Sequence, residues 1–180
     1  MIAIAAVVVA ALAAAVLLYA ATKPDAFRIE RAASIKAPPE KVFALIDDLH
    51  AWSAWSPWEK LDPALKKTFS GAARGKGAAY AWEGNKQVGA GRMEIVESSP
   101  SSRIAIKLDF LKPFEGHNVA EFALEARDGV TRVTWSMRGP LPYFAKVLHV
   151  ILPMDRMIGK SFEDGLANMK AAAEKEAGRP

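Results

Sequence analysis

Histidines and paired carboxylates are the side chains with which this chain could perform acid–base chemistry. The three histidines, His50, His117 and His149, are far apart in the sequence and lack the spacing of metal ligands. His50 follows two aspartates, which is typical of an exposed helix end. His149 lies in an apolar run, which is typical of a partly buried structural histidine. His117 lies beside Glu115 and Asn118 at the start of an expected strand, so we select it as the candidate polar site residue.

Other motifs argue against several classes of site. The chain has no cysteine, which excludes disulfides, thiolate zinc sites and cysteine nucleophiles. The glycine-rich stretch 71–77 lacks the spacing of a phosphate-binding loop and has no Ser or Thr after Lys76. A formal net charge of +4, with acids and bases interspersed, does not indicate a nucleic-acid partner. We therefore expect no metal, no cofactor and no nucleic acid, and no catalytic constellation is identifiable.

The first 22 residues form an uncharged apolar segment. All 24 basic and 20 acidic residues lie in residues 23–180. As a helix rising about 1.5 Å per residue, the segment can cross a hydrocarbon core of about 30 Å, with Tyr19 and Lys23 suited to the interface. We interpret residues 1–22 as an uncleaved single-pass transmembrane anchor. A cleaved secretory signal and a buried core helix are the alternatives.

The flanking charges bear on both the alternatives and the orientation. No basic residue precedes the apolar run, which argues against a signal peptide. Lys23, Arg28 and Arg31 follow it, so the positive-inside rule favours a cytoplasmic domain. One short flank leaves the side of the membrane open.

Beyond residue 26 the hydrophobic pattern is typical of strands that bury one face. We expect strands at 27–36, 66–70, 78–83, 87–97, 102–111, 116–127 and 130–138. This alternation places no pair of carboxylates on the apolar face, although a shift of one residue would turn Glu94 or Glu121 inward.

Helical patterns flank these strands. We expect one short helix at 39–46, a second, apolar one at 143–152, and a long helix from Pro153 to Glu176 with an apolar stripe. The run 141–153 either packs over the end of the sheet, lies against a bilayer or gates a cavity. Because a sheet with one apolar face needs a cover, we predict an α+β fold with a curved antiparallel sheet around the C-terminal helix. The expected divisions are an anchor (1–22), a linker (23–26), a domain (27–176) and a polar tail (177–180).

Three stretches accompany this element order and together resemble a known family. They are Trp55-Ser56-Pro57-Trp58 with Asp62-Pro63, the run 129–135 and the run 158–170. They are similar to the polyketide cyclase/dehydrase-like branch of the SRPBCC superfamily, over about residues 27–174. The resemblance implies the START-like helix-grip fold. Because that family includes lipid carriers, ring cyclases and hydratases, the resemblance implies no single function.

A helix-grip fold implies a cavity between the sheet and the closing helix. Strand alternation and the helical stripe select candidates for its lining, which are Trp82, Phe110, Phe122, Trp135, Met137, Ile158 and Phe162. We expect Trp55 and Trp58 to complete the lining, where the short helices meet the sheet. The alternative is that these residues fill a solid core.

These observations lead to three hypotheses. The first is a membrane-anchored module that binds a small hydrophobic or amphipathic, lipid-like ligand. The second is a cyclase- or hydratase-type enzyme on the same scaffold. The third is an envelope protein with a solid core and only a protein-interaction role. The sequence leaves the ligand and the oligomeric state open.

Overall fold

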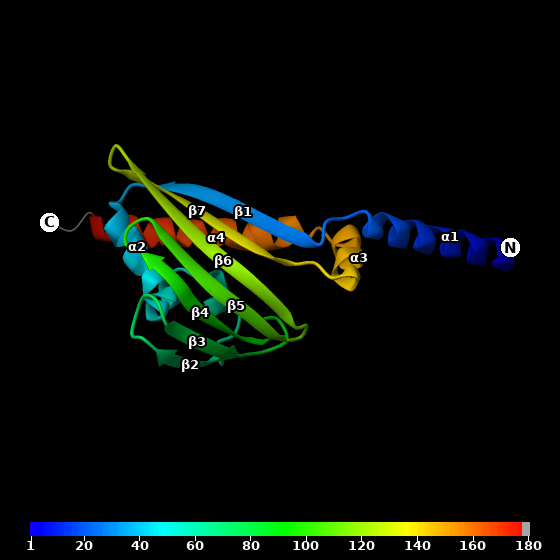
Figure 1. Ribbon diagram of the computed structural model, residues 1–180, viewed down its shortest axis with the longest axis horizontal. Coiled ribbons are helices and arrows are strands. Elements are labelled where there is room, and N and C mark those ends of the chain that lie inside the picture. The colour runs from blue at the N-terminus through cyan, green and yellow to red at the C-terminus, as the bar shows by residue number, and fades with distance from the viewer. Residues whose placement is uncertain (178–180) are drawn as a thin grey trace.

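The protein folds as one curved antiparallel sheet with a long helix inside the curve, in a computed structural model that describes residues 1–177 (Figure 1). The predicted fold class is confirmed. Of the expected tail 177–180, residues 178–180 lie outside the described residues. The elements are α1 (Ile2–Ala21), β1 (Ala26–Ile35), α2 (Pro39–Asp47), the 3-10 turns η1 (Leu49–Ala54) and η2 (Pro57–Lys60), β2 (Lys66–Gly71), β3 (Ala78–Glu83), β4 (Ala90–Ser99), β5 (Arg103–Lys112), β6 (Gly116–Arg127), β7 (Val130–Pro140), α3 (Tyr143–Ile151) and α4 (Met154–Ala177).

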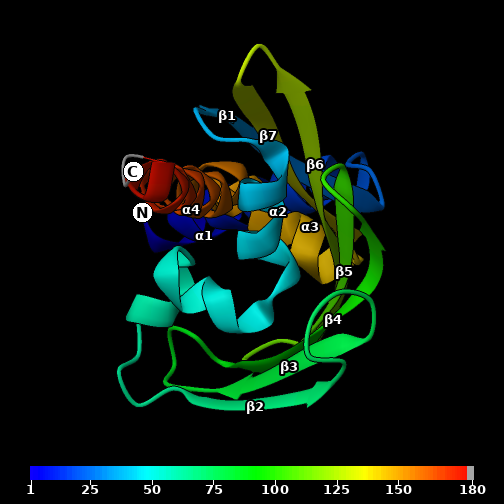
Figure 2. The ribbon, with the colours of Figure 1, turned by 90° about the vertical axis from the view of Figure 1, so that its left-hand side faces the viewer.

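The seven strands form a single sheet in the order β1-β7-β6-β5-β4-β3-β2. Strands β2 to β7 follow one another as a meander, and β1 adds to the free edge of β7. Figure 2 shows the sheet curling from β1 and β7 around to β2 and β3, with α4 and α2 inside the curl. The predicted register holds, because Glu94 and Glu121 lie on the outer face and pair there with Arg92 and Arg103.

Helix α4 packs against the inner face of the sheet in two different ways along its length. Its C-terminal half buries Leu166, Met169 and Ala173 completely in the core. Near its N-terminus, Met154 and Ile158 are only half-buried and border an open space. The helix therefore divides the interior into a solid end and a hollow end.

An aromatic stack marks the boundary between these ends. The Trp135 ring lies parallel to Phe162 of α4 at a centroid distance of 4.2 Å, and it stacks on Phe122 of β6 at 4.8 Å. Trp55, at the C-terminal end of η1, contacts both Phe122 and Trp135 edge to face. Gly165 is required beside it, because an added Cβ would lie 2.8 Å from Trp135 Cζ3.

A pair of ion pairs joins α4 to β1, the strand at one edge of the sheet. Arg31 pairs with Glu163 through Nε at 2.9 Å and with Asp155 through Nη2 at 3.0 Å. The two acids are eight residues apart on α4, and the guanidinium lies over Gly159 between them, where a Cβ would collide with it. The half-buried Arg31 thus holds the hollow half of α4 against the sheet.

Helix α1 extends away from the domain, as Figure 1 shows. Of its residues only Ala20 is buried, and the hydrophobic core contains no residue of α1. Among the described residues it is the one helix that is long and apolar enough to cross a membrane, judged by length and composition. The core of the domain does not depend on it.

Gly165→Ala tests the close approach of α4 to Trp135. The new Cβ would also lie 3.2 Å from Pro57 Cδ, so rigid groups crowd it from two sides. Overpacking costs about 1–3 kcal/mol, against a gain of about 1 kcal/mol for alanine over glycine in a helix. We therefore expect the free energy of unfolding, measured with urea, to fall by roughly 1 kcal/mol.

The matched control is Gly116→Ala, where an added Cβ meets nothing within 4 Å. Because alanine replaces glycine there without a clash, it should leave the free energy of unfolding unchanged or raise it by up to about 1 kcal/mol. A Gly165→Ala protein that is more stable than the parent would contradict the close contact.

Candidate functional site

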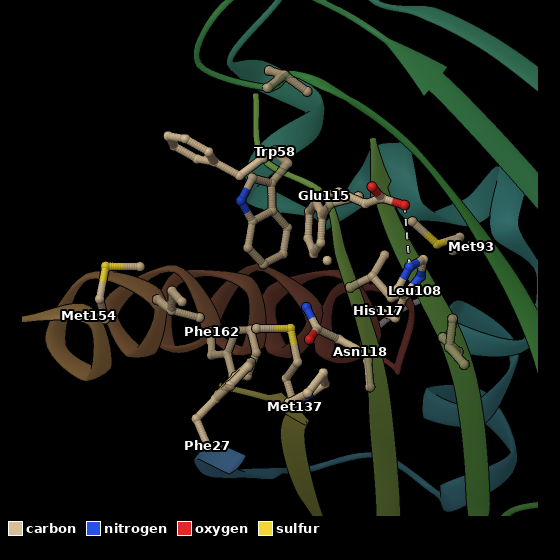
Figure 3. A pocket seen from close by; sticks show the side chains of 18 of the residues that line it. Phe27, Trp58, Met93, Leu108, Glu115, His117, Asn118, Met137, Met154 and Phe162 are labelled. Carbon is tan, nitrogen blue, oxygen red and sulfur yellow. Dashed lines mark ion pairs between the residues drawn. The ribbon is translucent and has the colours of Figure 1, made fainter. Parts of the chain in front are cut away.

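A cavity of about 810 Å³ lies between the sheet and the first turns of α4 (Figure 3). Its volume is within the range of about 300–1,000 Å³ that is typical of small-molecule sites. Its inner wall is formed by η2, β3, β4 and β5, where the lining residues Tyr80 and Met93 are buried. Its most exposed lining residues, Asp25, Phe114 and Glu115, lie beside α3 and in the β5–β6 loop, so the mouth is at that end.

Seven of the nine residues expected at the cavity lie in its wall. They are Trp58, Trp82, Phe110, Trp135, Met137, Ile158 and Phe162. Trp82 and Phe110 contact each other edge to face at 5.8 Å, and Trp58 meets both Trp135 and Phe162 in the same way. The wall is thus a set of interlocked rings, which gives the cavity a defined shape.

Trp55 and Phe122 lie elsewhere. Both are fully buried in the solid end of the domain, behind Trp135, and neither belongs to the cavity wall. The Trp55 indole donates a hydrogen bond from Nε1 to the Leu45 carbonyl at 2.7 Å. Alternation identified the inner face correctly, but it could not tell the hollow end of that face from the packed end.

A polar cluster that the sequence did not reveal lies in the cavity wall. The Tyr80 hydroxyl donates to Glu59 Oε1 at 3.1 Å, and the second carboxylate oxygen of Glu59 pairs with Lys67. Burial, followed by the negative charge of Glu59, raises the pKa of Tyr80, so its hydroxyl stays protonated at neutral pH. Both carboxylate oxygens of Glu59 therefore have partners within the protein.

Asn118 places a second polar group in the cavity. Figure 3 shows its amide pointing inward from β6, and it has no side-chain hydrogen bond among the described residues. Gly139 on the neighbouring strand makes room for it, because a Cβ there would collide with Asn118 Oδ1. Trp135 Nε1, which is buried, also lacks a partner within residues 1–177. Two cavity residues thus carry polar groups that the protein itself does not satisfy.

His117, the predicted polar site residue, lies at the mouth with its ring on the outer face. It is opposite Asp109 in the β5–β6 register, and its Nδ1 is 2.7 Å from Asp109 Oδ1. Its Nε2 lies 3.5 Å from Glu115 Oε1, the ion pair drawn in Figure 3. His117 and Glu115 both belong to the cavity lining, at its mouth. Because 61% of the His117 side chain is exposed and its shorter contact is to Asp109 on the outer face, His117 forms an ion pair at the entrance rather than a base inside the cavity.

The other two histidines each pack against a phenylalanine ring. His149 of α3 lines the cavity mouth next to Phe27, and burial lowers its pKa. The His50 ring stacks on Phe69 at 3.9 Å, and its Nδ1 lies 3.0 Å from the accepting carboxylate oxygen Oδ1 of Asp48. Within residues 1–177 no three His, Asp or Glu side chains converge in a way that could hold a metal ion.

The family model for "Polyketide cyclase / dehydrase and lipid transport" matches residues 26–174. The chain belongs to this family. It is therefore a member of the SRPBCC helix-grip superfamily, as the resemblance in the sequence implied. The family's description covers both enzymes and carriers, so it supports a ligand-binding or cyclase/dehydrase-like function without choosing between them. No curated protein sequence matches the chain.

Solved structures share the fold at low sequence identity. The di-domain ARO/CYC StfQ of the steffimycin biosynthetic pathway is 14% identical with a TM-score of 0.64, over 86% of this chain and 53% of that one. The Aha1 dimer from Colwellia psychrerythraea is 17% identical with a TM-score of 0.60, over 82% of this chain and 96% of that one. Ara h 8.0201 is 14% identical with a TM-score of 0.56, over 83% and 99%. These similarities support the fold alone.

The ion pair at the mouth leads to a prediction about pH. The hydrogen bond to Asp109 raises the pKa of His117 above its ordinary value of about 6.5, and the hydrogen bond from His117 lowers the pKa of Asp109. The pair stabilises the fold while the histidine is protonated and the aspartate ionised. This contribution is complete below the ordinary histidine pKa and is lost as the pH rises through the raised one. It is also lost as the pH falls through the depressed pKa of Asp109.

Titration of the His117 ring protons by NMR measures this pKa directly. Asp109→Asn should bring it back down towards 6.5, because the carboxylate is removed while the strand pairing remains. Glu115→Gln, which removes the more distant carboxylate, should lower it less. An unchanged His117 pKa in the Asp109→Asn protein would contradict the pairing.

Proposed function

We propose that the protein is a membrane-anchored binding module for a small hydrophobic or amphipathic, lipid-like molecule held between the sheet and α4. The observation that carries this proposal is the cavity. It has the volume of a ligand site, and apolar and aromatic side chains form most of its wall. Transfer of an apolar ligand from water to such a wall gains roughly 25 cal/mol per Å² of buried surface.

The unsatisfied polar groups in the wall favour an amphipathic ligand over a pure hydrocarbon. The Asn118 amide borders the cavity without a protein partner, so a ligand that covered it without bonding it would leave a polar group unpaired at a cost of about 1–3 kcal/mol. A hydroxyl or carbonyl on the ligand would remove this cost. Glu59 and Tyr80, which are hydrogen-bonded to each other, add a second polar region to the cavity wall.

Helix α1 is the element that would attach the domain to a membrane. Helix α1 has the length and composition to span a bilayer, and the core of the domain is complete without it. It would hold the domain, proposed as residues 27–176, at the membrane in which lipid-like ligands dissolve. The basic residues after α1 favour the cytoplasmic side.

One observation favours an enzyme as the second candidate. Glu59 is a carboxylate in the cavity wall that accepts a hydrogen bond from Tyr80, which is the kind of pair that acid–base chemistry uses. However, Tyr80 stays protonated, and Lys67 occupies the other oxygen of Glu59. Because the one hydroxyl proton of Tyr80 already goes to Glu59, the pair offers a ligand the lone pairs of the Tyr80 oxygen and no free base. The third hypothesis required a solid core, and the cavity counts against it.

Filling the cavity tests the proposed function. In the segment 24–180, Leu108→Trp would project an indole into the space between Met93 and Asn118. We expect it to weaken binding of the fluorescent apolar probe N-phenyl-1-naphthylamine at least about tenfold, which corresponds to about 1.4 kcal/mol. Val96→Trp, at an exposed position outside the wall, should bind like the parent. Equal binding by both variants would contradict the site.

The polar contact is tested separately. Asn118→Val keeps the shape of the wall but removes the amide, so a long-chain alcohol should lose a hydrogen bond worth about 0.5–1.5 kcal/mol. We expect its affinity, measured by displacement of the probe, to fall about two- to tenfold. The affinity for an alkane of equal length should not fall. A parallel loss for both compounds would show that Asn118 does not contact the ligand's polar group.

A further inference from the structure

Large apolar side chains are exposed around the cavity mouth. Leu111 and Phe114 lie at the β5–β6 end of the sheet and are 59% and 67% exposed. Phe144 and Ile151 of α3 are 63% and 62% exposed, and the Phe114 and Phe144 rings contact each other at 6.2 Å. We call these four residues the apolar rim. Exposed apolar residues that gather in this way mark an interaction surface.

Helix α3 connects the rim to the cavity. Ala145 and His149, four residues apart, line the mouth. Phe144, Leu148 and Ile151, which follow a helical repeat, form an adjacent side roughly 100° around the helix. A helix with this arrangement is suited to lie in a membrane interface with its apolar side buried. The same short helix therefore borders both the cavity and the outer apolar surface.

The end of α1 lies directly against α3. The Tyr143 hydroxyl donates to the Leu17 carbonyl at 2.8 Å, and the buried Lys146 pairs with Asp25 at 2.6 Å. Leu17 lies four residues before the end of α1, or about 6 Å along the helix. In Figure 1, α3 lies crosswise at the base of α1. A bilayer crossed by α1 would therefore reach the level of α3.

We propose that the apolar rim rests in the bilayer beside α1, so that the cavity mouth opens into the lipid rather than into water. A ligand would then pass between membrane and cavity without crossing the aqueous phase. This inference rests on the proposed function, and it adds the surface through which the ligand enters. The partner is the lipid bilayer itself, because the rim continues the apolar surface of α1. A second copy of the chain or another protein on the rim is an outcome that the test must distinguish.

The absence of cysteine allows a direct test on the full chain. Single cysteines introduced as Phe114→Cys, Phe144→Cys or Ile151→Cys are labelled with the fluorophore NBD, and the protein is placed in phosphatidylcholine/phosphatidylglycerol nanodiscs. Ala126→Cys, exposed at the far end of β6, is the matched control. We expect a blue-shifted emission at the three rim positions and quenching by doxyl-labelled lipid, with neither at residue 126.

Two results would overturn the proposal. Rim probes as water-exposed as the probe at residue 126 would place the rim outside the bilayer. A blue shift without quenching by the labelled lipid would show that a second copy or another protein covers the rim.

A double variant separates this inference from the proposed function. Phe144→Asp with Ile151→Asp changes two exposed side chains, so the melting temperature should stay unchanged. An NBD probe on Phe114→Cys in this background should lose its quenching, and uptake of N-phenyl-1-naphthylamine from the nanodisc lipid should slow at least severalfold. Quenching and uptake equal to the parent would contradict the bilayer-facing mouth. If the parent showed lipid contact at the rim but bound no probe, the proposed function would fail while the rim contact stood.

Discussion

The stack of Trp135 on Phe162 is the contact on which the interior of the domain depends. It fixes α4 inside the curve of the sheet at one point, with Gly165 allowing the approach and Phe122 supporting the ring from behind. On one side of this point the helix packs completely against the sheet. On the other side Arg31 holds the helix at the β1 edge, and the space towards β3, β4 and β5 stays open. A cavity and a stable core can therefore exist in the same small domain.

The direction of the hollow end has consequences for function. The cavity opens where β5, β6 and α3 meet, which is the end of the domain that carries α1. An apolar helix at the opposite end, near the β6–β7 turn, would direct the mouth away from any bilayer that it crossed. The end of α1, the rim and the mouth are instead adjacent, which fits the proposed exchange of a ligand with a bilayer.

Strand alternation predicted much of the fold and part of the site. Because Phe122 was placed on the inner face, Asn118, four residues earlier on the same strand, was also an inward residue, and Tyr80 follows from Trp82 in the same way. These signals were present in the sequence and were missed. Glu59 was not accessible to such reasoning, since it lies in the 3-10 turn η2 and reaches Tyr80 only after that turn has folded across β3. The positions of Trp55 and Phe122 likewise depend on where α4 closes the sheet, which no local pattern encodes.

The central claim is that the cavity holds a small hydrophobic or amphipathic molecule. Native mass spectrometry of the segment 24–180, purified from cells without detergent, tests it most directly. We expect a one-to-one adduct with a small molecule that organic solvent extracts, and we expect the Leu108→Trp protein to lack it. Both proteins appearing only at their bare polypeptide masses would contradict the claim.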